Sequence, residues 1–151
     1  MLSALLVFFC VHDYIQWLFP LAEKSAFNPH ARVVDESVIQ FFRRDLRLQE
    51  NLRRSLSVML GFYGLKCYET ESGKIVVEKS EADPIRKREW ICLFNHNYLR
   101  IIRILKCLVT FGLQAEAEAF YECLSQLYQE DSDRIGGETF QYWTKAVAVE
   151  C

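Results

Sequence analysis

Residues 96–106 read His-Asn-Tyr-Leu-Arg-Ile-Ile-Arg-Ile-Leu-Lys, and the apolar pattern continues to Phe111. Apolar side chains recur at helical spacing on nearly every side of this segment, which is typical of a helix buried at the centre of a domain. Arg100 and Arg103 lie three residues apart, so they project from nearly one face of that helix. The sequence therefore predicts a central helix from about Asn97 to Phe111 that carries two guanidinium groups in need of partners.

The first 64 residues predict three further helices. Residues 2–19 form an apolar run that ends before Pro20, which cannot continue a helix. Asp35 is suited to cap the second helix and Asp45 the third, although the same pattern also fits one continuous helix. Gly64 follows the last apolar position and marks the end of this pattern.

The remaining segments alternate between turn signals and helical patterns. Residues 66–78 place a Glu-Ser-Gly turn between two short runs, which is typical of a small hairpin. Pro84 suits the first turn of a short helix that we expect to extend to Phe94. Gly112 ends the central helix, and the short link after it predicts an antiparallel partner helix. Gly136 separates that partner from a last helix.

The composition fits one globular domain with an aromatic core. The chain has 151 residues, of which 51% are hydrophobic and 14% aromatic, with 3 Trp, 7 Tyr and 11 Phe. The low content of 6 Gly and 3 Pro argues against a turn-rich all-β fold. We predict an all-α fold over residues 1–151, a single compact helical domain of about six or seven helices with a small hairpin at 66–78.

The cysteine pattern predicts free thiols. None of the cysteines forms a Cys-x-x-Cys pair, and disulfide scaffolds are usually smaller and richer in loops. Free thiols in a reducing compartment therefore fit all six, which are Cys10, Cys67, Cys92, Cys107, Cys123 and Cys151.

The N-terminal run Leu2–Val11 is apolar but short. A bilayer-spanning helix needs about 20 residues, and a signal peptide needs a basic flank and a small-residue cleavage site. We expect this run to belong to a buried helix.

Charge is distributed unevenly along the chain, although the net charge is only −2. Basic residues dominate 86–106 and acidic residues dominate 113–138. We expect the two regions to complement each other within the fold or to lie on solvated faces, and a basic patch for an anionic partner is the alternative. The isoelectric point near 5.9 argues against a nucleic-acid-binding domain.

No local pattern predicts a reaction or a metal. The sequence has no Gly-x-Ser-x-Gly, no P-loop and no Gly-x-Gly-x-x-Gly. His12 and Asp13 are adjacent, so on a helix they would point about 100° apart. Cys92 and His96 would share a face if one helix continued through both, but the paired spacings of zinc sites are absent. We expect no catalytic residue, no metal and no cofactor.

The two arginines of the central helix allow two interpretations. The first is an internal ion-pair network that joins the first helix to the central one. The second is a pocket that recognises a carboxylate or phosphate, for which guanidinium groups are well shaped. Candidate internal partners are Asp13, Glu116, Glu118 and Glu122.

Two long strings also resemble a known family. They are His-Asp-Tyr-Ile-Gln-Trp-Leu-Phe-Pro at 12–20 and His-Asn-Tyr-Leu-Arg-Ile-x-Arg-Ile-Leu at 96–105. Together with Leu56–Leu65 and Thr139–Val147, in the same order, they resemble the conserved domain of the opioid growth factor receptor family over about residues 12–148. The resemblance implies a largely helical domain without known catalytic activity. Vertebrate members are described as receptors for an enkephalin peptide that restrain growth and associate with the nucleus.

We therefore expect a non-enzymatic binding domain for an enkephalin-like peptide or a protein partner, with a growth-regulatory receptor role. The resemblance implies a cytoplasmic or nuclear location, and membrane association rests on the family label alone. The candidate binding residues come from physical reasoning and are His12, Asp13, Trp17, His96, Asn97, Arg100 and Arg103. The alternative is a small helical enzyme or anion-binding protein that uses Arg100, Arg103 and His96. A third hypothesis is a surface for assembly.

Overall fold

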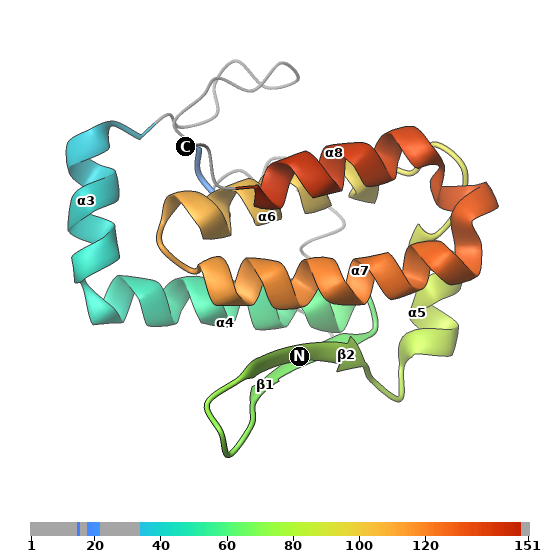
Figure 1. The fold of residues 1–151 in the computed structure, drawn as a ribbon, viewed down its shortest axis with the longest axis horizontal. Helices are drawn as coiled ribbons and strands as arrows, with labels where there is room; N and C mark the ends of the chain where they lie inside the picture. Colours follow the sequence, from blue (N-terminus) through green and yellow to red (C-terminus); the bar gives the residue numbers. More distant parts are fainter. Residues whose placement is uncertain (1–14, 16–17, 22–33, 149–151) are drawn as a thin grey trace.

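The computed structural model describes residues 15, 18–21 and 34–148. This part of the chain forms six helices and one two-stranded hairpin (Figure 1). In chain order the elements are α3 (Glu36–Arg44), α4 (Leu46–Phe62), β1 (Leu65–Glu69), β2 (Ile75–Lys79), α5 (Asp83–Trp90), α6 (Asn97–Thr110), α7 (Gln114–Ile135) and α8 (Gly137–Val147). The architecture confirms the expected helical fold and the small hairpin.

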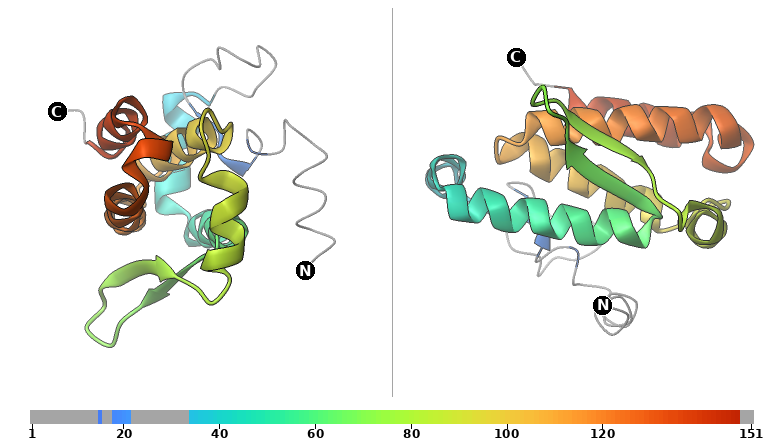
Figure 2. Two further views of the ribbon diagram at one scale, coloured as in Figure 1. Left: turned by 90° about the vertical axis from the view of Figure 1, so that its right-hand side faces the viewer. Right: turned by 90° about the horizontal axis from the view of Figure 1, so that it is seen from below.

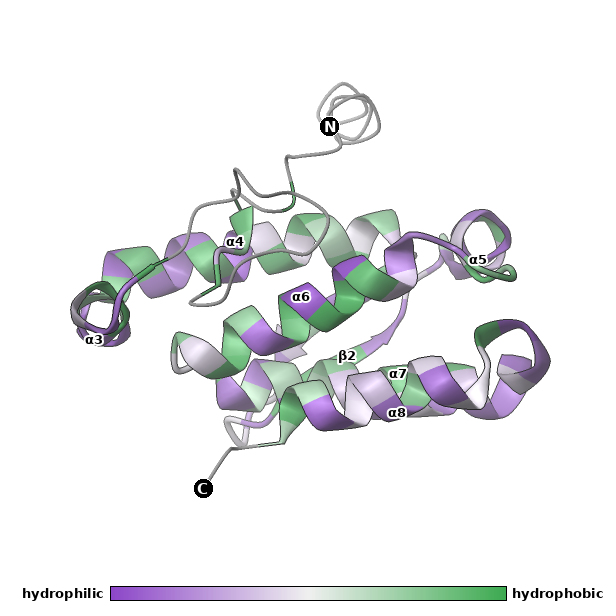
Figure 3. Ribbon diagram, turned by 90° about the horizontal axis from the view of Figure 1, so that it is seen from above, coloured by the Kyte–Doolittle hydropathy of each residue, from purple (hydrophilic) through white to green (hydrophobic). Residues whose placement is uncertain are grey.

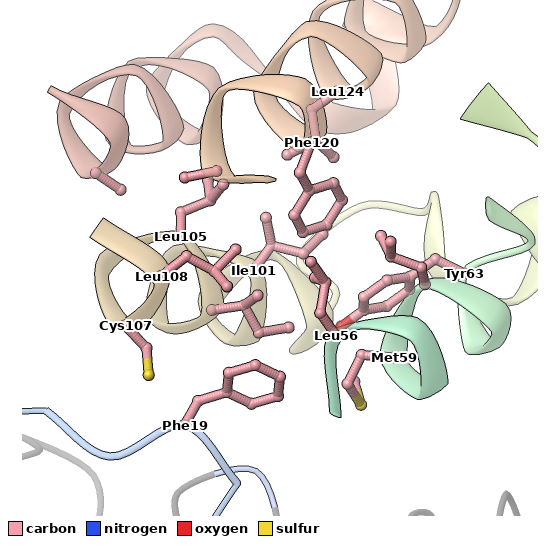
Figure 4. Close-up of a cluster of buried hydrophobic side chains, with 14 of the residues drawn as sticks. Phe19, Leu56, Met59, Tyr63, Ile101, Leu105, Cys107, Leu108, Phe120 and Leu124 are labelled. Atoms are coloured by element: carbon pink, nitrogen blue, oxygen red, sulfur yellow. The ribbon is translucent and has the colours of Figure 1, made fainter. Parts of the chain in front are cut away.

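Helix α6 occupies the centre of the fold, as its sequence predicts. It lies between α4 on one side and the pair α7 and α8 on the other (Figure 3). Its side chains Ile101, Ile104 and Leu105 are fully buried. Leu56 of α4 and Phe120 of α7 lie close to these side chains in the core (Figure 4). Most apolar residues of α6 are therefore explained by neighbours on both sides, although Leu99 is 49% exposed.

Two aspartates decide that α3 and α4 are separate helices. The carboxylate of Asp35 accepts a hydrogen bond from the Val38 amide at 3.0 Å, and that of Asp45 accepts one from the Leu48 amide at 3.0 Å. Asp45 has an extended backbone, so the chain turns sharply there and α3 runs across the end of α4 (Figure 1). The alternative of one continuous helix is wrong.

The expected helix from Pro84 to Phe94 is shorter than predicted. Helix α5 ends at Trp90, whose indole N–H donates to the Tyr63 carbonyl at 3.1 Å. Residues 91–96 form a loop in which Phe94 has a φ of 59°. Helix α5 ends where the Trp90 ring is buried against the end of α4. No local turn residue in the sequence predicts this end.

The hairpin spans α4 and α7 and projects beyond the helices (Figure 2). Its strands pair antiparallel with Cys67 opposite Val77. Strand β1 packs against α4, and β2 packs against α7. Leu65 and Val77 are buried on the inner face, which anchors the base of the hairpin to the core.

Lys87 links the basic region 86–106 to the acidic region 113–138. Lys87 of α5 binds Glu130 at 2.9 Å and also binds Asp131 of α7. Lys79 at the end of β2 binds the same Glu130 carboxylate. These contacts lie beside a kink in α7, where Asp131 leaves helical geometry with φ −131° and ψ 38°. The acidic stretch of α7 therefore holds β2 and α5 in place.

Most of the predicted N-terminal helix lies outside the described residues. At its end, the Phe19 amide donates to the Ile15 carbonyl at 2.9 Å, which is the helical spacing. The Phe19 ring is fully buried and points under α6 (Figure 4).

Within the described ranges, Cys67, Cys92, Cys107 and Cys123 are free thiols, as expected. No helix in the same ranges has the length and apolar character that crossing a bilayer requires.

The turn after α4 predicts an unequal response to two Gly→Ala changes. Gly64 has a φ of 76°, and a Cβ there would lie 2.7 Å from the Asp83 Cα. We expect Gly64→Ala to lower the free energy of unfolding by about 2 kcal/mol or more, because strain and a backbone clash add. Gly61 lies inside α4, where a Cβ would meet no atom within 4 Å, so Gly61→Ala is the matched control and should raise stability by up to ~1 kcal/mol. Urea unfolding of both variants checks this, and equal effects would contradict it.

The Glu130 cluster predicts a pH dependence of stability. Hydrogen bonds from Lys79 and then Lys87 lower the Glu130 pKa from its ordinary value of 4.5. A carboxyl with a lowered folded-state pKa stabilises the fold above its unfolded-state pKa and loses that contribution as the pH falls through the folded value. Below about pH 4.5, the free energy of unfolding should therefore fall more steeply in the wild type than in Glu130→Gln. Urea titrations from pH 7 to pH 3 measure this, and parallel curves would disprove it.

Candidate functional site

The structure places only part of the predicted binding set. His12, Asp13 and Trp17 lie outside the described residues. His96 is exposed at the start of α6, and its side chain makes no capping hydrogen bond. Asn97 is buried in the first turn of the same helix. The two neighbouring residues therefore differ in what they can reach, and only His96 faces solvent.

The Asn97 side chain joins three segments. Its Oδ1 accepts hydrogen bonds from the Tyr63 hydroxyl at 3.2 Å and from Arg100 Nη1 at 3.4 Å. Its Nδ2 and its backbone amide both donate to Asn95 Oδ1 at 2.8 Å. These bonds connect the end of α4, the loop before α6 and α6 itself. Asn97 is therefore engaged within the fold on both its amide oxygen and its amide nitrogen.

Aromatic rings surround this polar centre. Tyr63 contacts Trp90 at a centroid distance of 4.9 Å, and Trp90 contacts Tyr98 at 6.4 Å. Tyr98 in turn contacts Trp143 of α8 edge-to-face at 5.8 Å. The Trp143 indole donates to the Tyr98 carbonyl at 3.1 Å. Burial raises the pKa of Tyr63, so its hydroxyl stays protonated and donates to its amide partner.

Arg103 is buried and bonds to the backbone. Its Nε donates to the Phe19 carbonyl at 2.7 Å, which ties the end of the first sequence block to α6. Two of the acidic residues considered as partners are engaged elsewhere, since Glu116 pairs with Arg53 and Glu118 accepts from Gln114. Asp13 lies outside the described residues, so a pairing with it stays a prediction.

Arg100 differs from Arg103 although they are three residues apart. It is half-buried rather than buried, and its hydrogen bond to Asn97 is long. It forms no ion pair with any residue in the described ranges. The two guanidinium groups therefore lie in different surroundings. The positive charge of Arg100 is not neutralised by an acidic side chain in the described ranges.

A cleft that sequence reasoning missed lies between α4, the hairpin and the start of α7. Its volume is about 380 Å³. It takes residues from elements that are far apart in the sequence, and it contains none of the predicted binding residues. The lining consists of Glu50, Arg53, Leu56, Ser57, Cys67, Tyr68, Glu69, Ile75 and Glu116.

The cleft carries an excess of negative charge. Arg53 Nε binds Glu116 Oε1 at 2.9 Å, and Glu116 is only 5% exposed. Arg53 Nη1 lies 3.8 Å from Glu50, which is much more exposed. Glu69 adds a third carboxylate near the tip of the hairpin. Three carboxylates and one guanidinium line the cleft, and Arg54 outside the lining contacts Glu50 at 4.0 Å. The negative charge that remains in excess favours a cationic group in this space.

The cleft thiol is not activated. Burial raises the pKa of Cys67, and the neighbouring Glu116 carboxylate raises it further. Burial also raises the pKa of Cys107, and it raises the pKa of Cys123 to about 11. Nucleophilic cysteines need the opposite shift, so none of these three thiols is prepared for covalent catalysis.

The expected shared face of Cys92 and His96 does not form. Both lie in or beside the loop at 91–96, so no continuous helix aligns them. Across the residues whose positions are given, no group of three His, Cys, Asp or Glu side chains is arranged to hold a metal ion.

Comparison with known proteins shows the family to which the chain belongs. Residues 7–150 match the family described as "Opioid growth factor receptor (OGFr) conserved region". The chain belongs to the opioid growth factor receptor family.

Several curated members of the family are clearly similar to this chain. The human opioid growth factor receptor is 37% identical over 103 residues, which cover 68% of this chain and 15% of that protein. The mouse receptor is 35% identical over 103 residues, covering 68% and 16%. Opioid growth factor receptor-like protein 1 of Xenopus tropicalis is 32% identical over 122 residues, covering 80% and 22%. The chain therefore spans less than a quarter of the length of these relatives. No solved structure gives a significant match.

Substitutions of Arg100 and Arg103 are expected to have different effects on stability. Arg103→Met leaves the buried Phe19 carbonyl without its donor, and we expect the free energy of unfolding to fall by about 1–3 kcal/mol. Arg100→Met is the matched control, because Arg100 is partly exposed and makes one long hydrogen bond. Its effect should stay within about 0.5 kcal/mol. Urea unfolding of both variants gives the comparison, and a larger loss for Arg100→Met would contradict the assignment.

Proposed function

We propose that this domain is a non-enzymatic binding module that engages a peptide or protein partner in the cleft between α4, the hairpin and α7. The observation that supports it is the cleft of about 380 Å³ in which three carboxylates face one guanidinium. Its size lies within the range of about 300–1,000 Å³ that ligand sites occupy.

The chemistry of the cleft suits one end of a peptide. Glu50 and Glu69 offer exposed carboxylates to an ammonium group, while the half-buried Ile75 offers apolar surface beside them. An enkephalin-like ligand has a free amine, a tyrosine and an apolar end. The relatives are named as receptors of an opioid growth factor, and a free-amine peptide is the ligand class that this cleft favours.

Arg100 supports a second candidate, recognition of an anionic group. It lies one helical turn after the exposed His96 and forms no ion pair within the ranges that the structure covers. A peptide carboxylate or a phosphate would be suited to its planar guanidinium. This candidate uses a different surface from the cleft, so variants separate the two.

The proposed cellular location and role rest on the family and on the free thiols. Four free cysteines among the described residues suit a reducing compartment, which is consistent with a cytoplasmic or nuclear location. A growth-regulatory role is inferred from the family name alone.

Calorimetric titration with an enkephalin pentapeptide tests the proposal. We expect wild type to bind, and both the Glu50→Gln/Glu69→Gln double variant and N-acetylation of the peptide to weaken binding by about tenfold or more, or ~1.4 kcal/mol. Glu122→Gln is the control for the change of charge, because Glu122 is exposed on α7 and does not line the cleft.

The outcomes separate the two candidates. No heat above background at high micromolar peptide would overturn the proposal, and so would equal losses in the double variant and in Glu122→Gln. A loss confined to Arg100→Gln, together with an unchanged affinity in the double variant, would favour the anion site.

A further inference from the structure

We propose that β1 is a docking edge, on which an extended peptide segment adds as a third strand and places a basic side chain in the cleft. This inference rests on the proposed function, because both use the same cleft. It adds the conformation of the partner and the chemistry of the side chain that enters.

The hydrogen bonds that flank the hairpin fix which residues of β1 face β2. The Ser80 amide donates to the Gly64 carbonyl at 2.9 Å, and the Thr70 amide donates to the Lys74 carbonyl at 2.8 Å. Hydrogen-bonded pairs alternate with non-hydrogen-bonded pairs along an antiparallel ladder. The residues of β1 that bond to β2 are therefore the even-numbered ones between these two pairs.

The odd-numbered residues of β1 direct their backbone groups to the opposite edge. Cys67 and Glu69 are non-hydrogen-bonded positions, opposite Val77 and Ile75. No hydrogen bond to the backbone N–H or C=O of Cys67 or Glu69 occurs anywhere in the described ranges. Among those residues, β1 has no neighbour other than β2 in the sheet. Two donors and two acceptors are thus offered in a row, which is what strand addition requires.

This free edge borders the cleft. Cys67, Tyr68 and Glu69 form one wall of the cleft, and Glu50 and Arg53 of α4 form the other. An added strand lies about 4.8 Å from its neighbour, so it would run beside β1 and over α4. Because side chains alternate along a strand, every second residue of the added segment would point into the cleft.

Charge selects the side chain that enters. Arg53 pairs closely with the buried Glu116, whereas Glu50 makes only long contacts, at 3.8 Å to Arg53 and 4.0 Å to Arg54. Glu69 forms no ion pair with any residue in the described ranges, so negative charge remains in excess in the cleft. An arginine or lysine side chain meets these carboxylates with its charged end, while its methylene stem covers the half-buried Ile75. The geometry is complementary to a basic residue in an extended segment.

The same charge disfavours a second copy of the chain as the occupant. Pairing of two β1 edges would bring together two clefts that both carry excess negative charge, which opposes association. A separate basic peptide therefore fits this edge better than self-association.

The test uses the capped heptapeptide Thr-Val-Thr-Arg-Thr-Val-Thr and its analogue with citrulline, the neutral isostere of arginine. We expect calorimetry to show binding of the arginine peptide below about 1 mM and a loss of about tenfold or more with citrulline. Single N-methylation along the peptide should abolish binding at alternate residues only, because alternate amides face β1. Glu50→Gln/Glu69→Gln should weaken binding, and Glu122→Gln should not.

Alkylation of individual thiols locates the bound peptide. Cys67 lines the cleft, whereas Cys92 is exposed and does not line it. The arginine peptide should slow alkylation of Cys67 and leave Cys92 unchanged when both are followed by mass spectrometry. Cys92 thereby serves as the internal control for reagent activity.

Three results would overturn the inference. These are no binding of the arginine peptide at about 1 mM, a flat N-methylation profile, and unprotected Cys67 in the presence of bound peptide. If the enkephalin pentapeptide still binds in a way that depends on Glu50 and Glu69, the proposed function stands and only strand addition fails. Dimers that compete with the peptide for the β1 edge would instead identify a second copy as the occupant.

Discussion

The end of α4 is fixed by Tyr63, and the arrangement of the cleft depends on it. The Tyr63 side chain is fully buried, its hydroxyl donates to Asn97, and its carbonyl accepts from the Trp90 indole. Three helices meet through this one residue: α4, α5 and α6. Immediately after it, Gly64 turns with a positive φ against Asp83, and the chain enters β1. The position of the hairpin over α4 and α7 therefore follows from a buried polar contact.

A buried charge also determines the electrostatics of the cleft. Glu116 sits at the start of α7 with almost no exposure, and a buried carboxylate is costly unless it is paired. Arg53 supplies that pairing across 63 positions of sequence. The guanidinium in the cleft lining is thereby held closely by Glu116, so Glu50 has only long contacts to Arg53 and Arg54, and Glu69 has no ion pair among the described residues. A stabilising ion pair thus leaves a site that favours cations.

The two arginines of α6 have different roles although they are only three residues apart. Arg103 faces the N-terminal block and donates to the Phe19 carbonyl inside the core. Arg100 lies nearly one turn earlier, toward the start of the helix, where it is half-buried and reaches the Asn97 amide oxygen at long distance. Arg103 therefore joins two segments of the chain, whereas the charged group of Arg100 stays near the surface. Their spacing in the sequence predicts a common face and does not reveal how deep each head group lies.

Apolar periodicity determined the helices around α6, because one buried face dictates a repeat of about 3.6 residues. Capping aspartates set the starts of α3 and α4, and Gly64 and Gly112 set helix ends, since these signals act over a few residues. Tertiary structure alone decided that α5 stops at Trp90 and that Glu50, Cys67 and Glu116 share one cleft. Those outcomes depend on contacts between residues that are distant along the chain, and neither local propensity nor periodicity records which distant partners will meet.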